Sequence, residues 1–157
     1  MIKATDKIKI AIGSDHRGVN LLRIVANYLE SEGYEVDEYG TSDLNTIDYP
    51  DIAATVAKKV SSGEVKEGIL ICGTGIGMCV VANKYPGVRA TPCTNDVAAE
   101  LSRKHNDANI LCLSGDMLGK GVCITLVEKW LSTGFEGGRH QLRLDKIDEI
   151  ERKLHNN

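Results

Sequence analysis

Short apolar runs of strand length alternate with helix-like segments from one end of the chain to the other. This alternation constrains the fold more than any other feature, because it is typical of a parallel sheet covered by helices on both faces. The expected strands lie at residues 9–12, 34–39, 68–72, 88–93 and 109–113. We therefore predict a single α/β domain that occupies the whole chain, residues 1–157.

Helices are predicted between these strands from apolar spacing, capping residues and the glycines that follow them. The expected helices cover 18–32, a segment from Pro50 to about 63, the residues after 77, a segment from Asn95 or Asp96 to about 105, residues 118–131 and a polar amphipathic segment after the loop 134–138. A polar loop, 41–48, precedes the second helix. No repeat, linker or low-complexity segment divides the chain.

Composition and charge exclude several classes of partner. The chain carries 19 Lys+Arg against 22 Asp+Glu, and this net charge of −3 gives no general affinity for nucleic acid or for an anionic membrane. Aromatic residues make up 4% of the chain, too few for base-stacking platforms. The longest apolar stretches have strand length, so no transmembrane segment is expected, and residues 1–7 lack the apolar region of a signal peptide.

The five cysteines are an odd number and form no C-x-x-C pair. Their apolar surroundings indicate reduced thiols, so we expect a cytoplasmic protein. Cys72 differs from the others because it ends an apolar strand and faces a glycine-rich loop, where oriented N–H groups favour the thiolate. We interpret it as a base or nucleophile, the alternative being a buried small hydrophobe. Packing is the expected role of the other four, Cys79, Cys93, Cys112 and Cys123.

The loop after Cys72 has glycine at every second position and reads Gly73-Thr74-Gly75-Ile76-Gly77. It matches neither the dinucleotide fingerprint G-x-G-x-x-G nor a P-loop, which requires Gly-Lys-Ser/Thr. It is also not the C-x5-R cradle of a cysteine phosphatase, because Met78 stands where that arginine would be. What remains is a nest of N–H groups for an oxyanion or a phosphate, or simply a tight turn between a strand and a helix.

Polar residues elsewhere have both a functional and a structural interpretation. Asp15-His16 follows the first strand, and the aspartate could bind a ligand or only cap the next helix. His105-Asn106 ends a helix, where a histidine is either a favourable terminal residue or an acid or base near neutral pH. Arg139 and Arg143, with His140 between them, lie one helical turn apart and could clamp a phosphate or pair with nearby aspartates.

Ligands of open parallel sheets bind beyond the carboxyl ends of the strands. Three of the polar segments follow expected strands directly, namely Asp15-His16, Cys72 with its loop and Pro92-Cys93-Thr94. We therefore expect these three segments to gather at one edge of the sheet.

The chain resembles the type B ribose-5-phosphate isomerases, which are grouped with the galactose-6-phosphate isomerase subunits. The matching segments occur in the expected order over nearly the whole chain: Gly13-Ser14-Asp15-His16, Asp48-Tyr49-Pro50, Ile71-Cys72-Gly73-Thr74-Gly75-Ile76-Gly77, Ala82-Asn83-Lys84, Ser102-Arg103-Lys104-His105-Asn106-Asp107-Ala108-Asn109 and Gly137-Gly138-Arg139-His140. The resemblance implies a Rossmann-like, three-layer α/β/α sandwich with a five-stranded parallel sheet and a C-terminal helix.

The resemblance also implies an aldose–ketose isomerase of the pentose phosphate pathway, with no metal and no cofactor, that interconverts ribose 5-phosphate and ribulose 5-phosphate through an enediolate. It assigns the proton transfer to Cys72 and ring opening to His105. It places the enediolate oxygens on the amides of residues 73–77. It gives sugar contacts to Asp15, His16 and Asn106, and it gives the phosphate to Arg139 and Arg143. It further implies homodimers, or dimers of dimers, whose sites are shared between subunits.

One position departs from the family pattern. Ribose-specific members commonly carry an arginine in a Gly-x-Arg segment after the fifth strand, where this chain has Asp116. A carboxylate beside a phosphate is repulsive, so we expect Arg17 to supply part of the missing positive charge. Alternatively, the preferred substrate is another sugar phosphate, such as allose 6-phosphate or galactose 6-phosphate. Rival classes for the same sheet edge are a nucleotide- or flavin-binding module and a thiol redox sensor.

Overall fold

The structure, a computed structural model, describes residues 7–42 and 45–155. Most of the amino-terminal segment 1–7 and two residues of the expected polar loop 41–48 lie outside the described residues.

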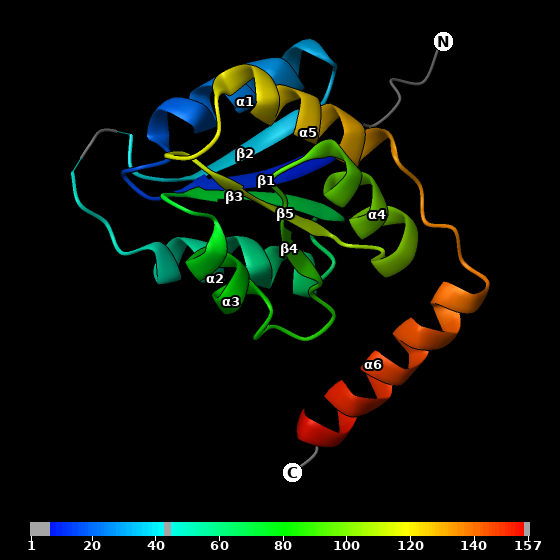
Figure 1. Ribbon diagram of the computed structural model, residues 1–157. Coiled ribbons are helices and arrows are strands. Elements are labelled where there is room, and N and C mark those ends of the chain that lie inside the picture. The colour runs from blue at the N-terminus through cyan, green and yellow to red at the C-terminus, as the bar shows by residue number, and fades with distance from the viewer. Residues whose placement is uncertain (1–6, 43–44, 156–157) are drawn as a thin grey trace, which may run out of the picture.

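Within the described part of the chain, five parallel strands form one sheet in the order β2-β1-β3-β5-β4, which confirms the predicted architecture (Figure 1). The strands are β1 Lys9–Ser14, β2 Glu35–Gly40, β3 Glu67–Cys72, β4 Ala90–Pro92 and β5 Ile110–Ser114. The helices are α1 Val19–Ser31, α2 Tyr49–Ser61, α3 Ile76–Ala82, α4 Asp96–Asn106, α5 Lys120–Ser132 and α6 Arg139–His155.

Two apolar cores lie on the two faces of the sheet, as the three-layer prediction requires. Helices α1, α4 and α5 cover one face, while α2 and α3 cover the other (Figure 1). Strand β3 contributes to both cores, because alternate side chains of a strand point to opposite faces. Ile69 and Ile71 belong to the α1–α5 side, whereas Leu70 and Cys72 belong to the α2–α3 side.

The strand order places the carboxyl ends of β1 and β3 at a topological switch point. The chain leaves β1 through α1 toward one edge of the sheet and returns through α2 to β3 on the other side of β1. The loops that leave β1 and β3 consequently diverge onto opposite faces, and a crevice forms between them. The fold thus selects the segments after Ser14 and Cys72 as a candidate ligand site.

Local signals explain where two of the helices begin. The side chain of Asn95 accepts a hydrogen bond of 2.8 Å from the N–H of Ala98, which confirms Asn95 as the cap of α4. Pro50 lies in the first turn of α2, where its missing N–H costs nothing.

Five free cysteines, all buried, agree with the expected reduced thiols. None of the helices among the described residues has the length and apolar content needed to cross a membrane.

Strand β4 is shorter than predicted. The expected range was 88–93, but the N–H of Val88 donates to Tyr85 within a turn at 3.1 Å, and the strand begins at Ala90. Pro92 is its last residue, and the N–H of Cys93 just beyond it still donates to the carbonyl of Cys112 on β5 at 3.2 Å. Helix α6 lies outside the three layers, because it extends away from the sheet and its covering helices (Figure 1).

Candidate active site

Asp15 and His16 form the turn that leaves β1. Asp15 is 5% exposed, and its Oδ1 accepts the N–H groups of Arg17 at 2.9 Å and Gly18 at 3.2 Å. The carboxylate thus fixes the turn that precedes α1, but it does not cap the helix, whose cap position is Gly18 and has no side-chain hydrogen bond. His16 is half-buried, and its Nδ1 lies 3.4 Å from the backbone of Ile47. Both residues stand at the switch point, as the strand prediction requires.

Cys72 is the last residue of β3 and is 4% exposed. The N–H of Gly75 donates to its Sγ at 3.2 Å, so the loop turns back onto the thiol. Gly75 has a φ of +77°, and a Cβ there would lie 3.1 Å from backbone atoms of Leu113. Glycine is therefore required at this position for two reasons, its positive φ and its close approach to β5.

The rest of the glycine loop is held by the segment that follows β5. Ser114 Oγ donates to the carbonyl of Gly73 at 2.6 Å and accepts the N–H of Met117 at 2.9 Å. The N–H of Gly115 donates to the carbonyl of Cys72 at 2.8 Å. The sequence interpretation did not assign a role to Ser114, although a buried serine at the end of an apolar strand could have indicated one.

Tyr49 is a second residue whose place in the site the sequence did not indicate. Its segment was interpreted as the start of a helix, which is confirmed, but its ring also lies against the glycine loop. A Cβ on Gly77 would come within 2.7 Å of that ring. Thr74 and Ile76 are exposed at the top of the loop, where the hydroxyl of Thr74 accepts the N–H of Ile76 at 3.3 Å.

Arg17 and Asp116 meet above the glycine loop. Nε of Arg17 donates to Oδ2 of Asp116 at 2.8 Å, and this hydrogen bond, followed by charge attraction, raises the pKa of the arginine. A Cβ on Gly73 would lie 2.9 Å from that carboxylate oxygen and 3.0 Å from Nε of Arg17. The carboxylate at position 116 is therefore paired with Arg17, the residue that the sequence analysis expects to supply part of the missing positive charge.

His105 and Asn106 lie at the opposite edge of the sheet from Cys72. They end α4, and the preceding turn is tied to the start of β3, because Arg103 pairs with Glu67 at 3.2 Å. Glu67 and Cys72 are the two ends of β3, which at about 3.3 Å per residue are roughly 16 Å apart. One chain by itself thus does not bring His105 and Cys72 together.

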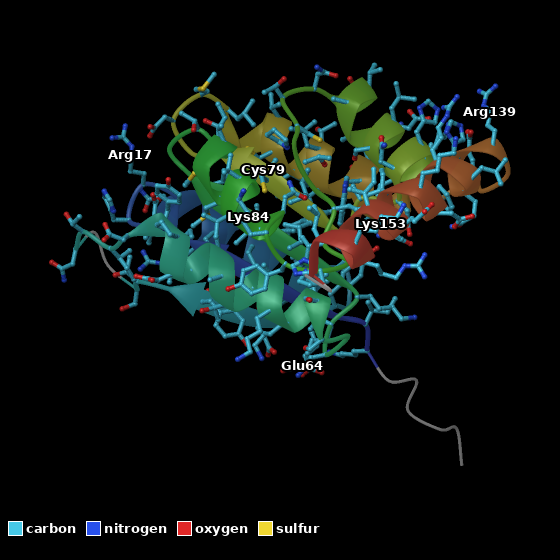
Figure 2. The ribbon with its side chains drawn as sticks, turned by 90° about the horizontal axis from the view of Figure 1, so that it is seen from below. Arg17, Glu64, Cys79, Lys84, Arg139 and Lys153 are labelled. Atoms are coloured by element: carbon cyan, nitrogen blue, oxygen red, sulfur yellow. The ribbon has the colours of Figure 1, made fainter. Side chains whose placement is uncertain are left out.

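Arg139 and Arg143 belong with His105. Residues 139–143 begin α6, as predicted, and both arginines are exposed. His140 stacks on His105 with ring centroids 4.2 Å apart and planes 9° apart. Figure 2 shows Arg17 and Arg139 at opposite ends of the molecule. The predicted site residues therefore form two groups. The carboxyl-edge group lies at the carboxyl ends of the strands and consists of Asp15, His16, Cys72 and the loop 73–77. The amino-edge group lies at the opposite end and consists of His105, Asn106, Arg139 and Arg143.

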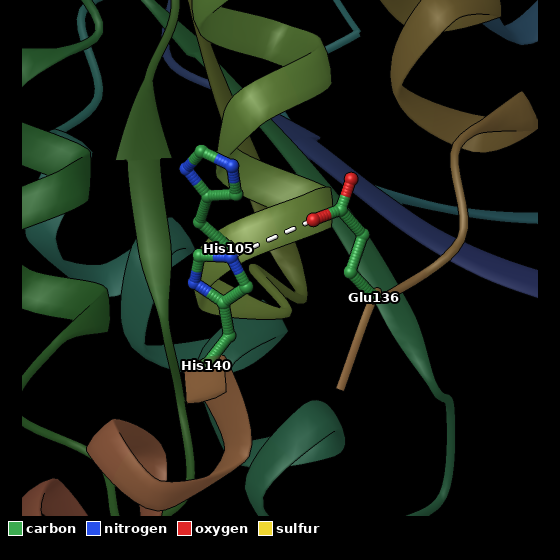
Figure 3. A group of neighbouring side chains, drawn as sticks. All are labelled: His105, Glu136 and His140. Carbon is green, nitrogen blue, oxygen red and sulfur yellow. Dashed lines mark ion pairs between the residues drawn. The ribbon is translucent and has the colours of Figure 1, made fainter. Parts of the chain in front are cut away.

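The amino-edge group contains a cluster that could be mistaken for a metal site. His105, Glu136 and His140 have ligand atoms within 4.8 Å of one another, and Glu136 Oε2 lies 3.5 Å from Nε2 of His140 (Figure 3). Nitrogen lone pairs lie in the ring planes, so two parallel stacked rings do not converge on one ion. Burial, His105 and the two neighbouring arginines lower the pKa of His140, and the same arginines repel a cation.

Comparison with known proteins agrees with this geometry. A family model described as Ribose/Galactose Isomerase matches residues 10–147. The chain belongs to this family. Every residue of both groups lies inside the matched range, and membership of the ribose/galactose isomerase family favours the isomerase interpretation over a flavin module or a thiol sensor.

Individual relatives in the ribose/galactose isomerase family cover almost the whole chain. The chain is 43% identical to ribose-5-phosphate isomerase B of Escherichia coli (strain K12) over 92% of its own length and 97% of that protein. It is 50% identical to the solved ribose-5-phosphate isomerase B of Clostridium thermocellum, with a TM-score of 0.91 and coverage of 94% and 99%. A Mycoplasma genitalium ribose-5-phosphate isomerase B solved with bound ribulose 5-phosphate is 43% identical, with a TM-score of 0.88 and coverage of 92% and 97%.

Proposed function

We propose that this protein interconverts ribose 5-phosphate and ribulose 5-phosphate without a metal or a cofactor. The observation that carries the proposal is Cys72, a thiol at the switch point whose sulfur accepts an N–H from the glycine loop at 3.2 Å. Aldose–ketose isomerisation needs a base beside a fixed site for developing oxyanion charge. Names of the relatives, one of them solved with ribulose 5-phosphate, support the substrate.

In the proposed reaction, the thiolate of Cys72 removes the proton from C2 of the open-chain aldose. The electron pair of that C–H bond forms the C1–C2 double bond, and the carbonyl electrons move to O1. Amides of the loop 73–77 stabilise the resulting enediolate. The thiol then returns its proton to C1 while the O2 proton is lost and O1 is protonated, which gives the ketose. Asp15 and His16 contact the sugar from the β1 loop.

The amino-edge group completes the site from a second copy of the chain. In the proposal, His105 assists opening of the furanose ring, Asn106 contacts the sugar, and Arg139 and Arg143 bind the phosphate. A homodimer, or a dimer of dimers, is supported by the roughly 16 Å that β3 places between the two groups within one chain. Light scattering on the purified protein measures this state, and a monomer that retains full activity would contradict the shared site.

Helix α6 supports the same assembly. Four large apolar side chains on it are exposed, at 66%, 47%, 59% and 72%: Leu142, Ile147, Ile150 and Leu154. Only His140 and Leu144 of this helix are buried. Exposed apolar side chains in such numbers are typical of a surface that a partner covers. We propose a cytoplasmic location on the basis of the five free thiols.

The decisive experiment assays ribose 5-phosphate, allose 6-phosphate and galactose 6-phosphate with one enzyme preparation. We expect the highest kcat/KM for ribose 5-phosphate and no loss of rate after dialysis against a chelator. Cys72→Ala, assayed in parallel, identifies any contaminating isomerase. A higher kcat/KM for either hexose phosphate would overturn the substrate, and a rate that the chelator abolishes would overturn the metal-free reaction.

A further inference from the structure

The Arg17–Asp116 pair lies over the glycine loop beside Cys72, yet nothing in the reaction described above uses it. The two residues come from the loops after β1 and β5, the strands that flank β3 on its two sides. Their side chains meet across the end of β3, over the residue next to Cys72. The pair thus forms one wall of the candidate site.

Stability does not explain this ion pair. The side chains of Arg17 and Asp116 are 58% and 38% exposed, and pairs so exposed to solvent contribute little to folding. The backbone beneath Arg17 is nevertheless tightly fixed. Its N–H donates to Asp15, a Cβ on Gly18 would lie 2.6 Å from the carbonyl oxygen of Ile71, and one on Gly115 would lie 2.7 Å from the carbonyl oxygen of Arg17.

The geometry leaves part of the guanidinium available to an anion. Arg17 has five N–H donors, and Asp116 engages Nε and Nη2 through a single carboxylate oxygen, Oδ2. Among the described residues, no protein acceptor faces Nη1 of Arg17. An arginine held along one edge keeps its orientation and presents its other edge, a planar arrangement suited to phosphate oxygens.

We propose that Arg17 binds the phosphate group of the substrate and that Asp116 is the positioning residue that orients its guanidinium. This assignment rests on the proposed isomerase function. Cys72 engages C1 and C2, so the phosphate of a sugar phosphate extends several bonds away from the thiol. The side chain of Arg17 lies over Gly73, the residue next to Cys72, and in this proposal it binds the phosphate there. The pair also sets specificity, because a neutral sugar gains nothing from this guanidinium.

Inorganic phosphate is the direct probe, because its binding does not depend on turnover. We expect Arg17→Ala to raise KM for ribose 5-phosphate and the inhibition constant of inorganic phosphate together, by about tenfold, with kcat nearly unchanged. Arg17→Lys recovers only part of this loss, because an ammonium group cannot pair with Asp116 and phosphate in one plane. Lys9→Ala, which breaks the exposed pair with Glu35 at the amino end of the sheet, is the matched control and leaves both constants unchanged.

The positioning role of Asp116 has its own readout. Asp116→Asn raises both constants in the wild-type background, but it raises neither once Arg17 is alanine. The double variant Arg17→Ala/Asp116→Arg carries the arginine on the loop after β5 instead of the loop after β1. It restores phosphate affinity relative to Arg17→Ala, because a side chain from either loop places a guanidinium over Gly73. Melting curves verify that each variant folds.

These measurements separate the assignment from the proposed function. If Arg17→Ala leaves the inhibition constant of phosphate unchanged, or if Asp116→Asn acts equally in both backgrounds, the assignment is wrong while the isomerase activity stands. If the wild-type protein does not turn over ribose 5-phosphate, the proposed function is wrong, and titration with inorganic phosphate still tests Arg17.

Discussion

The two groups of predicted site residues, at the carboxyl and amino edges of the sheet, differ in how exposed and how fixed they are. At the carboxyl edge, Asp15 and Cys72 are 5% and 4% exposed and are fixed by backbone hydrogen bonds from their own loops. At the amino edge, Asn106, Arg139 and Arg143 are exposed, and the helix that carries the two arginines extends away from the sheet (Figure 1). This difference supports the proposal that the fixed edge holds the reacting group and that the exposed edge meets a second copy of the chain.

The largest expected effect tests the fixed edge. Cys72→Ala should lower kcat by about 10²- to 10⁴-fold, the usual contribution of a positioned base, while the melting temperature changes little. Cys93→Ala removes another buried thiol, which belongs to the core on the other face, and should keep its activity. Steady-state kinetics and thermal melts on the two variants make the comparison, and near-normal turnover in Cys72→Ala would remove the thiol from its role.

The next effect tests whether the two edges work together across a subunit interface. Cys72→Ala and His105→Ala should each be poorly active, and refolding them together in equal amounts should restore about one quarter of the wild-type activity. Half of the dimers are then mixed, and two-fold symmetry gives each mixed dimer one intact site. Refolding each variant alone is the control. No recovery in mixed dimers would mean that each chain builds its site alone.

Sequence reasoning was strongest where the signal is local. The strand that ends in Cys72, the cap at Asn95 and the place of Pro50 in the first turn of α2 follow from neighbouring residues, and the structure confirms them. The partition of the site into two edges was harder to predict, because it depends on the direction in which α4 runs relative to β3. Ser114 and Tyr49 touch the glycine loop only after distant segments have packed. The end of an apolar strand could have drawn attention to Ser114, but no local signal connected Tyr49 with the loop.

A third effect concerns the conformation of the glycine loop. Gly75→Ala must adopt a positive φ, which costs roughly 1–2 kcal/mol, and its Cβ also presses on backbone atoms of Leu113. Gly63 has a φ of +76°, and a Cβ on it would meet no atom within 4 Å, so Gly63→Ala isolates the conformational cost. We expect both variants to melt a few degrees lower, but only Gly75→Ala to lose activity. Equal activity in the two would show that the N–H on Cys72 does not matter.

The smallest effect lies at the amino edge and depends on pH. Burial, with the nearby charges of His105, Arg139 and Arg143, lowers the pKa of His140 below its ordinary 6.5, while Glu136 opposes the shift. The unfolded chain therefore binds more protons than the folded one as pH falls through that range, so this residue makes the protein less stable in acid. The contribution of His140 to the free energy of unfolding is fully present above pH 6.5, and it is lost as the pH decreases toward the pKa of His140 in the folded protein.

Thermal melts between pH 7.5 and about pH 5 measure this loss. His140→Asn should show a smaller decrease in melting temperature over the range than the wild type. His155→Asn, an exposed histidine near the end of the same helix, should retain the full decrease. Each variant lacks one histidine of α6, so the difference between their curves reports His140 together with its contact with His105. Identical slopes for the two variants would mean that protonation of His140 does not contribute to the loss of stability in acid.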